Sequence, residues 1–128
     1  MLESMDITKT YTNEITVKKS KFIAILQPCK NETELKEQIQ IIKKEHSKAR
    51  HVVHAAVWGA NSDTFSMSDD KEPKFTAGKP ILNTLLGSGI TNASLIVVRY
   101  FGGTLLGRGG LTHAYKDAAK AVIDTTVN

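Results

Sequence analysis

The sequence predicts an α+β fold, in which helices pack against a sheet and enclose one hydrophobic core. An apolar run at the start of 95–100 indicates a buried strand, residues 51–58 have the pattern of a hairpin strand, and residues 31–47 show a helical period. Strand-like and helix-like segments follow one another in the order β-β-α-β-β-α-β-α. Residues 1–128 are therefore expected to form a single domain of ordinary size.

The first half of the chain is expected to supply strands and one helix. Residues 1–10 carry no clear pattern and are expected to be disordered. Residues 15–28 are rich in β-branched and aromatic side chains, but a lysine-rich stretch interrupts them. They therefore form two short strands or one bent strand. Asn31 or Thr33 caps a helix that runs to about Ser47.

The second half is expected to begin with a hairpin that joins strands 51–58 and 64–68. Pro80 suits the first turn of a helix through Leu86, which glycines then end. The buried strand 95–100 follows, and a last helix carries apolar residues at helical spacing from Leu111 onwards. This order predicts a two-layer sandwich with the helices on one face of the sheet.

Composition limits the cellular setting. Apolar residues make up 41% of the chain, yet no segment approaches the roughly 20 apolar residues that span a bilayer. The N-terminus lacks the basic start and apolar block of a secretory signal. A single cysteine, Cys29, excludes an internal disulfide and fits a reducing compartment. A cytoplasmic protein that does not associate with membranes is expected.

The strand at 95–100 leads into a glycine loop and then the last helix. Five of the nine glycines in the chain fall in this loop: Gly102, Gly103, Gly107, Gly109 and Gly110. A strand, a glycine loop and a helix N-terminus can present backbone N–H groups to an anion, and Arg99 and Arg108 could add charge-assisted contacts. The spacing matches neither a Walker A loop nor GxGxxG. The alternative is a tight strand-to-helix connection.

The chain has a net charge of +4, and its basic residues are concentrated in the first half. Two groups stand out: Lys18, Lys19 and Lys21 flank one strand, and Lys43, Lys44, Lys48 and Arg50 cluster near a helix end. A basic surface of this size permits binding to a polyanion such as RNA. The alternative is that these lysines solubilise the surface and balance a helix C-terminus.

Three acids, Asp69, Asp70 and Glu72, lie within four residues and precede Pro73. Such a cluster could hold a hard cation such as Mg²⁺. The alternative is an exposed acidic turn. No His/Cys set has the spacing of a zinc site, and no partnered nucleophile is evident. No catalytic residue is therefore assigned.

Several ordered motifs resemble the IMPACT family and its YigZ-like bacterial members over about residues 15–125. The matching segments are Ser20–Ala24, His51, the acidic cluster with Pro73, Thr76–Leu82, Val98–Gly103, Leu106–Leu111 and Ala114-Tyr115. The resemblance implies a two-layer sandwich with a left-handed crossover, like the second domain of a small-subunit ribosomal protein. It also implies a link to translational control.

Three departures from the family pattern bear on these expectations. Lys71 and Phe75 stand where relatives usually have glycine. If those glycines need a positive φ, the loop here must take another path, which weakens any acidic-site function. Bacterial relatives usually continue into a ferredoxin-like domain, so this chain either works as a single domain or is a truncated form. A homodimer could cover the apolar surface left by a missing partner.

The leading hypothesis is a non-enzymatic module linked to translation that contacts RNA, the ribosome or a translation-linked protein. One alternative is an enzyme or nucleotide binder that uses the glycine loop for phosphate and the acids for a metal. The other is a protein-interaction module that binds no nucleic acid. Salt dependence separates the first hypothesis from the last, because counterion release gives RNA binding a steep salt slope.

Overall fold

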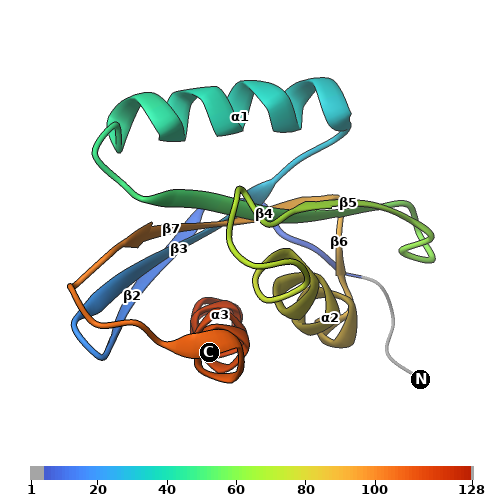
Figure 1. Cartoon of the computed structure of the whole chain (residues 1–128). Helices are drawn as coiled ribbons and strands as arrows, with labels where there is room; N and C mark the ends of the chain where they lie inside the picture. The colour runs from blue at the N-terminus through green and yellow to red at the C-terminus, as the bar shows by residue number, and fades with distance from the viewer. Residues whose placement is uncertain (1–4, 128) are drawn as a thin grey trace.

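The computed structural model describes residues 5–127 and contains a five-stranded antiparallel sheet with helices on both faces (Figure 1). The strand order is β2-β3-β7-β4-β5. The elements in chain order are β1 (Met5–Asp6), β2 (Tyr11–Val17), β3 (Ser20–Pro28), α1 (Glu32–Glu45), β4 (His51–Trp58), β5 (Thr64–Ser68), α2 (Gly78–Ser88), β6 (Ile90–Thr91), β7 (Ala93–Tyr100) and α3 (Gly107–Asp124). The predicted α+β class is confirmed.

The layering differs from the expectation at one helix. α2 and α3 cover one face of the sheet, whereas α1 lies on the other (Figure 1). Alternate residues of the central strands serve the two faces: Val53 and Val97 join the core under α2 and α3, and Val52 and Val98 pack with Ile42 of α1. A strand buried on both faces reads as a continuous apolar run. That run was present at both strands, and it is the signal that a second helical layer is required.

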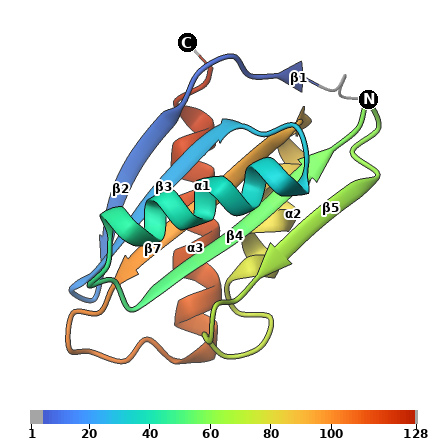
Figure 2. The same cartoon turned by 90° about the horizontal axis from the view of Figure 1, so that it is seen from above.

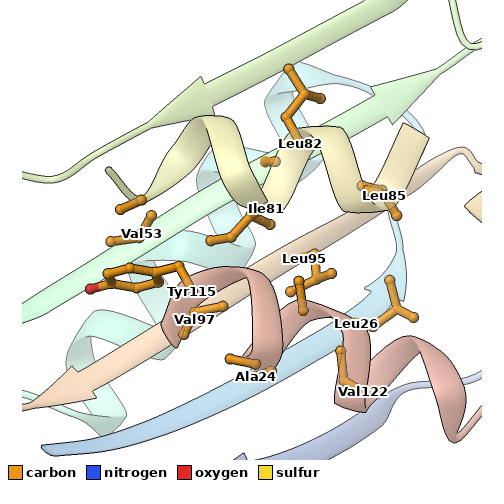
Figure 3. Packing of buried hydrophobic residues seen from close by; sticks show 14 of the residues in the cluster. Ala24, Leu26, Val53, Ile81, Leu82, Leu85, Leu95, Val97, Tyr115 and Val122 are labelled. Atoms are coloured by element: carbon orange, nitrogen blue, oxygen red, sulfur yellow. The ribbon is translucent and has the colours of Figure 1, made fainter. Parts of the chain in front are cut away.

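The larger core lies between the sheet and the α2–α3 pair (Figure 3). Tyr115 is the largest fully buried side chain, and its ring meets Phe22 edge-on at a centroid distance of 5.1 Å. Aromatic pairs in this geometry add to the free energy of burial. The core therefore fixes α3 against β3 and β7, the strands that carry the glycine loop and its neighbours.

Two crossover connections join parallel strands. β3 and β4 are parallel and joined through α1, while β5 and β7 are parallel and joined through α2. Compared with the first connection, the second starts from a strand of opposite direction, moves the opposite way across the sheet and crosses over the opposite face. Reversing all three inverts the hand of a crossover, so the two connections have opposite hands. The α2 connection is left-handed (Figure 2), whereas about 98% of such connections are right-handed. The left-handed crossover implied by the family resemblance is confirmed.

Near the N-terminus the chain is more ordered than expected. Met5–Asp6 pairs in parallel with Ile90–Thr91, and Ile7 is buried in the core. The expectation of disorder over residues 5–10 is therefore wrong, because a short strand and one apolar anchor hold them. Residues 1–4 lie outside the described part.

Other boundaries follow the predictions closely. Residues 11–28 form two strands, joined at Lys18 and Lys19, which both have positive φ. Asn31 caps α1 by accepting a hydrogen bond from the Glu34 N–H. α3 begins at Gly107, two residues before the Gly109-Gly110 pair that was expected to open it, because the glycines of its first turn carry no apolar period that could mark the start. None of the helices within residues 5–127 is long and apolar enough to cross a membrane.

Candidate anion-binding site at one end of the sheet

The glycine loop, the β2–β3 turn and the start of β4 meet at one end of the sheet. The strand register places Lys21 opposite Tyr100 and His51 opposite Arg99. The N-terminus of α3 lies at the same end (Figure 2). The fold therefore brings together residues from distant parts of the sequence.

A pocket of about 290 Å³ opens at this end, and we call it the arginine pocket. Its lining consists of Arg50, His51, Glu72, Pro73, Arg99, Phe101, Leu105, Leu106, Gly107, Arg108 and Leu111. Arg50 and Arg108 are exposed, and the Arg50 guanidinium lies 4.6 Å from the centre of the Phe101 ring. Their charges are available to a ligand, because neither forms an ion pair among the described residues.

The first turn of α3 borders this pocket. No side chain within residues 5–127 caps that turn, whose N-cap residue is Leu106. The first N–H groups of a helix have no partner inside the helix and carry a partial positive charge. Arg108 lies in this first turn and lines the pocket, and Arg50 lines it as well, although the sequence places Arg50 only in the basic cluster near the end of the first helix.

The glycines of the loop are not all required for the same reason. A Cβ on Gly102 would come within 1.9 Å of the Lys19 carbonyl oxygen, so this position fixes the loop against the β2–β3 turn. Gly103 and Gly107 have φ of +88° and +74°, in the left-handed region. A Cβ on Gly109 would meet no described atom within 4 Å. Neither close contact nor backbone conformation therefore requires glycine at position 109.

Arg99 has a different environment from the one expected. It is buried, its Nη1 donates to Glu72 Oε2 at 2.7 Å, and its Nη2 donates to the Ser20 hydroxyl at 3.3 Å. Its Nε is buried without a hydrogen-bond partner among the described residues. Arg99 lines the pocket, but the carboxylate of Glu72 neutralises its charge. The main role of Arg99 is therefore to hold the acidic loop in place.

Glu72 is the centre of a buried polar cluster. The Tyr115 hydroxyl donates to Glu72 Oε2 at 2.5 Å, and His51 Nε2 lies 3.4 Å from Glu72 Oε1. Burial, and then the hydrogen bond to Glu72, raise the pKa of Tyr115, so its hydroxyl remains a donor. His51 Nδ1 donates to the Asp70 carbonyl at 2.7 Å. Tyr115 was interpreted only as a core residue, because its position on the apolar face of α3 concealed the role of its hydroxyl.

The three carboxylates do not converge on a cation. Asp69 accepts hydrogen bonds from the backbone N–H groups of Phe75, Ala77 and Gly78, and Asp70 accepts one from Val52. Among residues 5–127, no group of three His, Cys, Asp or Glu side chains could hold a metal ion. The structure therefore does not form the metal site suggested for Asp69, Asp70 and Glu72, because each carboxylate organises a different part of the loop.

The acidic loop keeps the conformation that glycines would favour. Lys71 has φ of 70° and Phe75 has φ of 67°, although both carry side chains. The expectation that the loop takes another path because of these residues is therefore wrong. Asp69 stabilises this conformation through the Phe75 N–H, at 2.9 Å.

The predicted lysine groups gather at the same end but are not equivalent. Lys18 and Lys19 are exposed at the β2–β3 turn, and the Lys21 ammonium lies 5.6 Å from the centre of the Tyr100 ring. Lys43 Nζ lies 4.0 Å from Asp70 Oδ1, so its charge is partly offset. Lys44 and Lys48 are exposed near the C-terminus of α1.

Fold and site together define a small α+β module with a basic pocket at one end of its sheet. The model of the Impact N-terminal domain matches residues 18–123. The chain therefore belongs to the IMPACT family. The IMPACT family member YigZ of Escherichia coli (strain K12) is 46% identical over 101 residues, which cover 77% of this chain and 50% of that protein. This chain spans about half the length of the curated relatives it matches.

Two solved structures resemble the fold. One, described as the crystal structure of a hypothetical protein, has a TM-score of 0.87 and 36% identity, covering 97% of this chain and 62% of that one. The other is the two-domain translational regulator Yih1, with a TM-score of 0.57 and 22% identity, covering 92% of this chain and 47% of that one. The second likeness shows the fold alone.

Proposed function

We propose that this chain is a non-enzymatic, translation-linked module of the cytoplasm that binds RNA through the basic end of its sheet. The observation that carries this proposal is the arginine pocket. Two exposed guanidinium groups, Arg50 and Arg108, flank the uncapped N-terminus of α3. Guanidinium groups and free helical N–H groups are donors that bind phosphate oxygens.

The β2–β3 turn extends the basic surface beyond the pocket. Gly102 approaches the Lys19 backbone so closely that the turn and the glycine loop lie side by side. Lys18, Lys19 and Lys21 therefore lie beside the start of the glycine loop, whose other end leads into α3. A ligand with several phosphates along its length fits this surface better than a single small anion.

The cysteine and the carboxylates that could act in catalysis are buried or have structural roles. Cys29 is buried, and burial raises the pKa of its thiol. Asp69, Asp70 and Glu72 hold the acidic loop in place. This favours binding over catalysis. The translation link draws on family membership and on Yih1, which is described as a translational regulator.

Arg108→Ala tests the proposal by fluorescence anisotropy with a labelled single-stranded RNA across a salt series. Wild type is expected to bind with an affinity that falls steeply with salt. Removing one phosphate contact should weaken binding and lower the slope of log K against log salt by about 0.7. Lys120→Ala is the matched control, because Lys120 is exposed near the far end of α3 beside Asp124.

Equal losses of RNA affinity in the two variants would mean that only the overall charge matters and would contradict a role for the arginine pocket. Absence of wild-type binding at low salt would contradict RNA binding altogether.

A further inference from the structure

Phe75 is exposed beside a second hollow, a groove between α2 and α3. The groove measures about 480 Å³ and is lined by Phe75, Lys79, Pro80, Asn83, Thr84, Thr112 and Lys116. The Phe75 side chain is 51% exposed, although aromatic side chains in a small domain usually join its core. Its backbone has a positive φ, which a phenylalanine adopts only at a cost in stability.

Positive charge surrounds the exposed ring. The ammonium groups of Lys74 and Lys79 lie 5.0 and 5.4 Å from the centre of the ring, and Lys116 lines the groove. Asn83 is exposed on the same lining and carries both a donor and an acceptor. An aromatic ring flanked by lysines is the combination that binds single-stranded nucleic acid, with a base on the ring and phosphates on the cations.

The Phe75 groove adjoins the arginine pocket. Arg108 lines that pocket, and its Nη2 donates to the Lys74 carbonyl at 2.8 Å. A strand whose phosphate contacts Arg108 therefore lies within reach of the Phe75 ring. A base that stacks on the ring displaces one lysine ammonium, which then becomes free to meet a neighbouring phosphate.

We infer that Phe75 stacks on an unpaired nucleobase, with Lys74 and Lys79 holding the flanking phosphates, so that the ligand is single-stranded RNA. This inference rests on the proposed RNA binding and names the form of RNA. A duplex would present its phosphates to the arginine pocket, but its bases are already stacked and unavailable to Phe75.

The test compares a short single-stranded RNA, its duplex and inorganic polyphosphate as ligands. Phe75→Gly and Phe75→Asn remove the ring at a position whose backbone suits both residues, so both variants should fold. Loss of one stacked base should weaken binding of the single strand by roughly 5- to 150-fold. Binding of the duplex and of polyphosphate should change less than twofold. Phe65→Ala, which removes an exposed ring from β5, is the matched control and should leave all three unchanged.

A Phe75→Trp variant gives a direct readout, because the native Trp58 is buried and stacking quenches an exposed indole. Single-stranded RNA should quench this fluorescence, and polyphosphate should not. Wild-type affinity of Phe75→Gly and Phe75→Asn for the single strand would overturn the stacking role while leaving RNA binding intact. If wild type binds polyphosphate but no RNA, or binds neither, both proposals fail.

Discussion

His54 lies on the face of β4 that meets α1. Burial, and then the nearby Lys43 ammonium, lower the pKa of its imidazole, while the carboxylates of Glu32 and Asp70 oppose this shift. The unfolded chain titrates near the ordinary value of 6.5, so it binds more protons than the folded chain as the pH falls below that value. The free energy of unfolding should therefore fall as the pH decreases through the folded pKa.

His54→Gln removes this titration and should flatten the loss of stability over the pH interval that begins near 6.5 and extends downward. Urea unfolding at stepped pH measures it, and His113→Gln, at an exposed position on α3, is the control. A His54→Gln variant that loses as much stability as wild type over this interval would show that other groups carry the pH dependence.

The sequence predicted the role of a residue well where that role depends on neighbours in the chain. Asn31 caps α1 as expected, because an N-cap acts within one turn. The departures at Lys71 and Phe75 were visible in the sequence, but their consequence was not. The carboxylate of Asp69 accepts the Phe75 N–H and helps to hold the left-handed backbone there, and only the folded loop reveals that contact.

At the scale of elements, Glu72 joins the acidic loop to β7, α3 and β4. Glu72→Gln would leave the buried Arg99 without its counter-charge, which should cost about 3–5 kcal/mol of folding stability.

Tyr115→Phe removes one hydrogen bond to a charged acceptor and should cost about 1.5–3 kcal/mol of folding stability.

Urea denaturation measures both losses, and a Glu72→Gln/Arg99→Met double variant should be less destabilised than the two single variants combined. A Glu72→Gln protein as stable as wild type would show that the buried pair contributes nothing.

The elements themselves were largely predictable, whereas their contacts were not. Apolar residue patterns located the main strands and two of the helices, because burial imposes that period, while Pro80 and the glycines after Leu86 located α2. The partners of Glu72 lie 27 and 43 residues along the chain, at Arg99 and Tyr115, so no local pattern could connect them. The short strands Met5–Asp6 and Ile90–Thr91 also escaped prediction, since two residues carry no period.

At the scale of the whole molecule, the fold gathers charge that the sequence distributes. The lysines of the β2–β3 turn and the arginines at positions 50 and 108 all meet at one end of the sheet (Figure 2). The sequence showed the net charge and the glycine loop, but not that Arg50 and Arg108 line one pocket. The antiparallel pairing of β4 with β7 places Arg50 at the end of β7, where the glycine loop begins.

An NMR titration with single-stranded RNA locates the binding surface, because the glycines report on different ends of the molecule. The amide signals of Gly103, Gly107 and Gly109 should shift at low salt and return as salt is raised. The signals of Gly59 and Gly87, outside the basic end, should stay in place. Shifts confined to Gly59 and Gly87, or no shifts at any glycine, would contradict RNA binding at the basic end of the sheet.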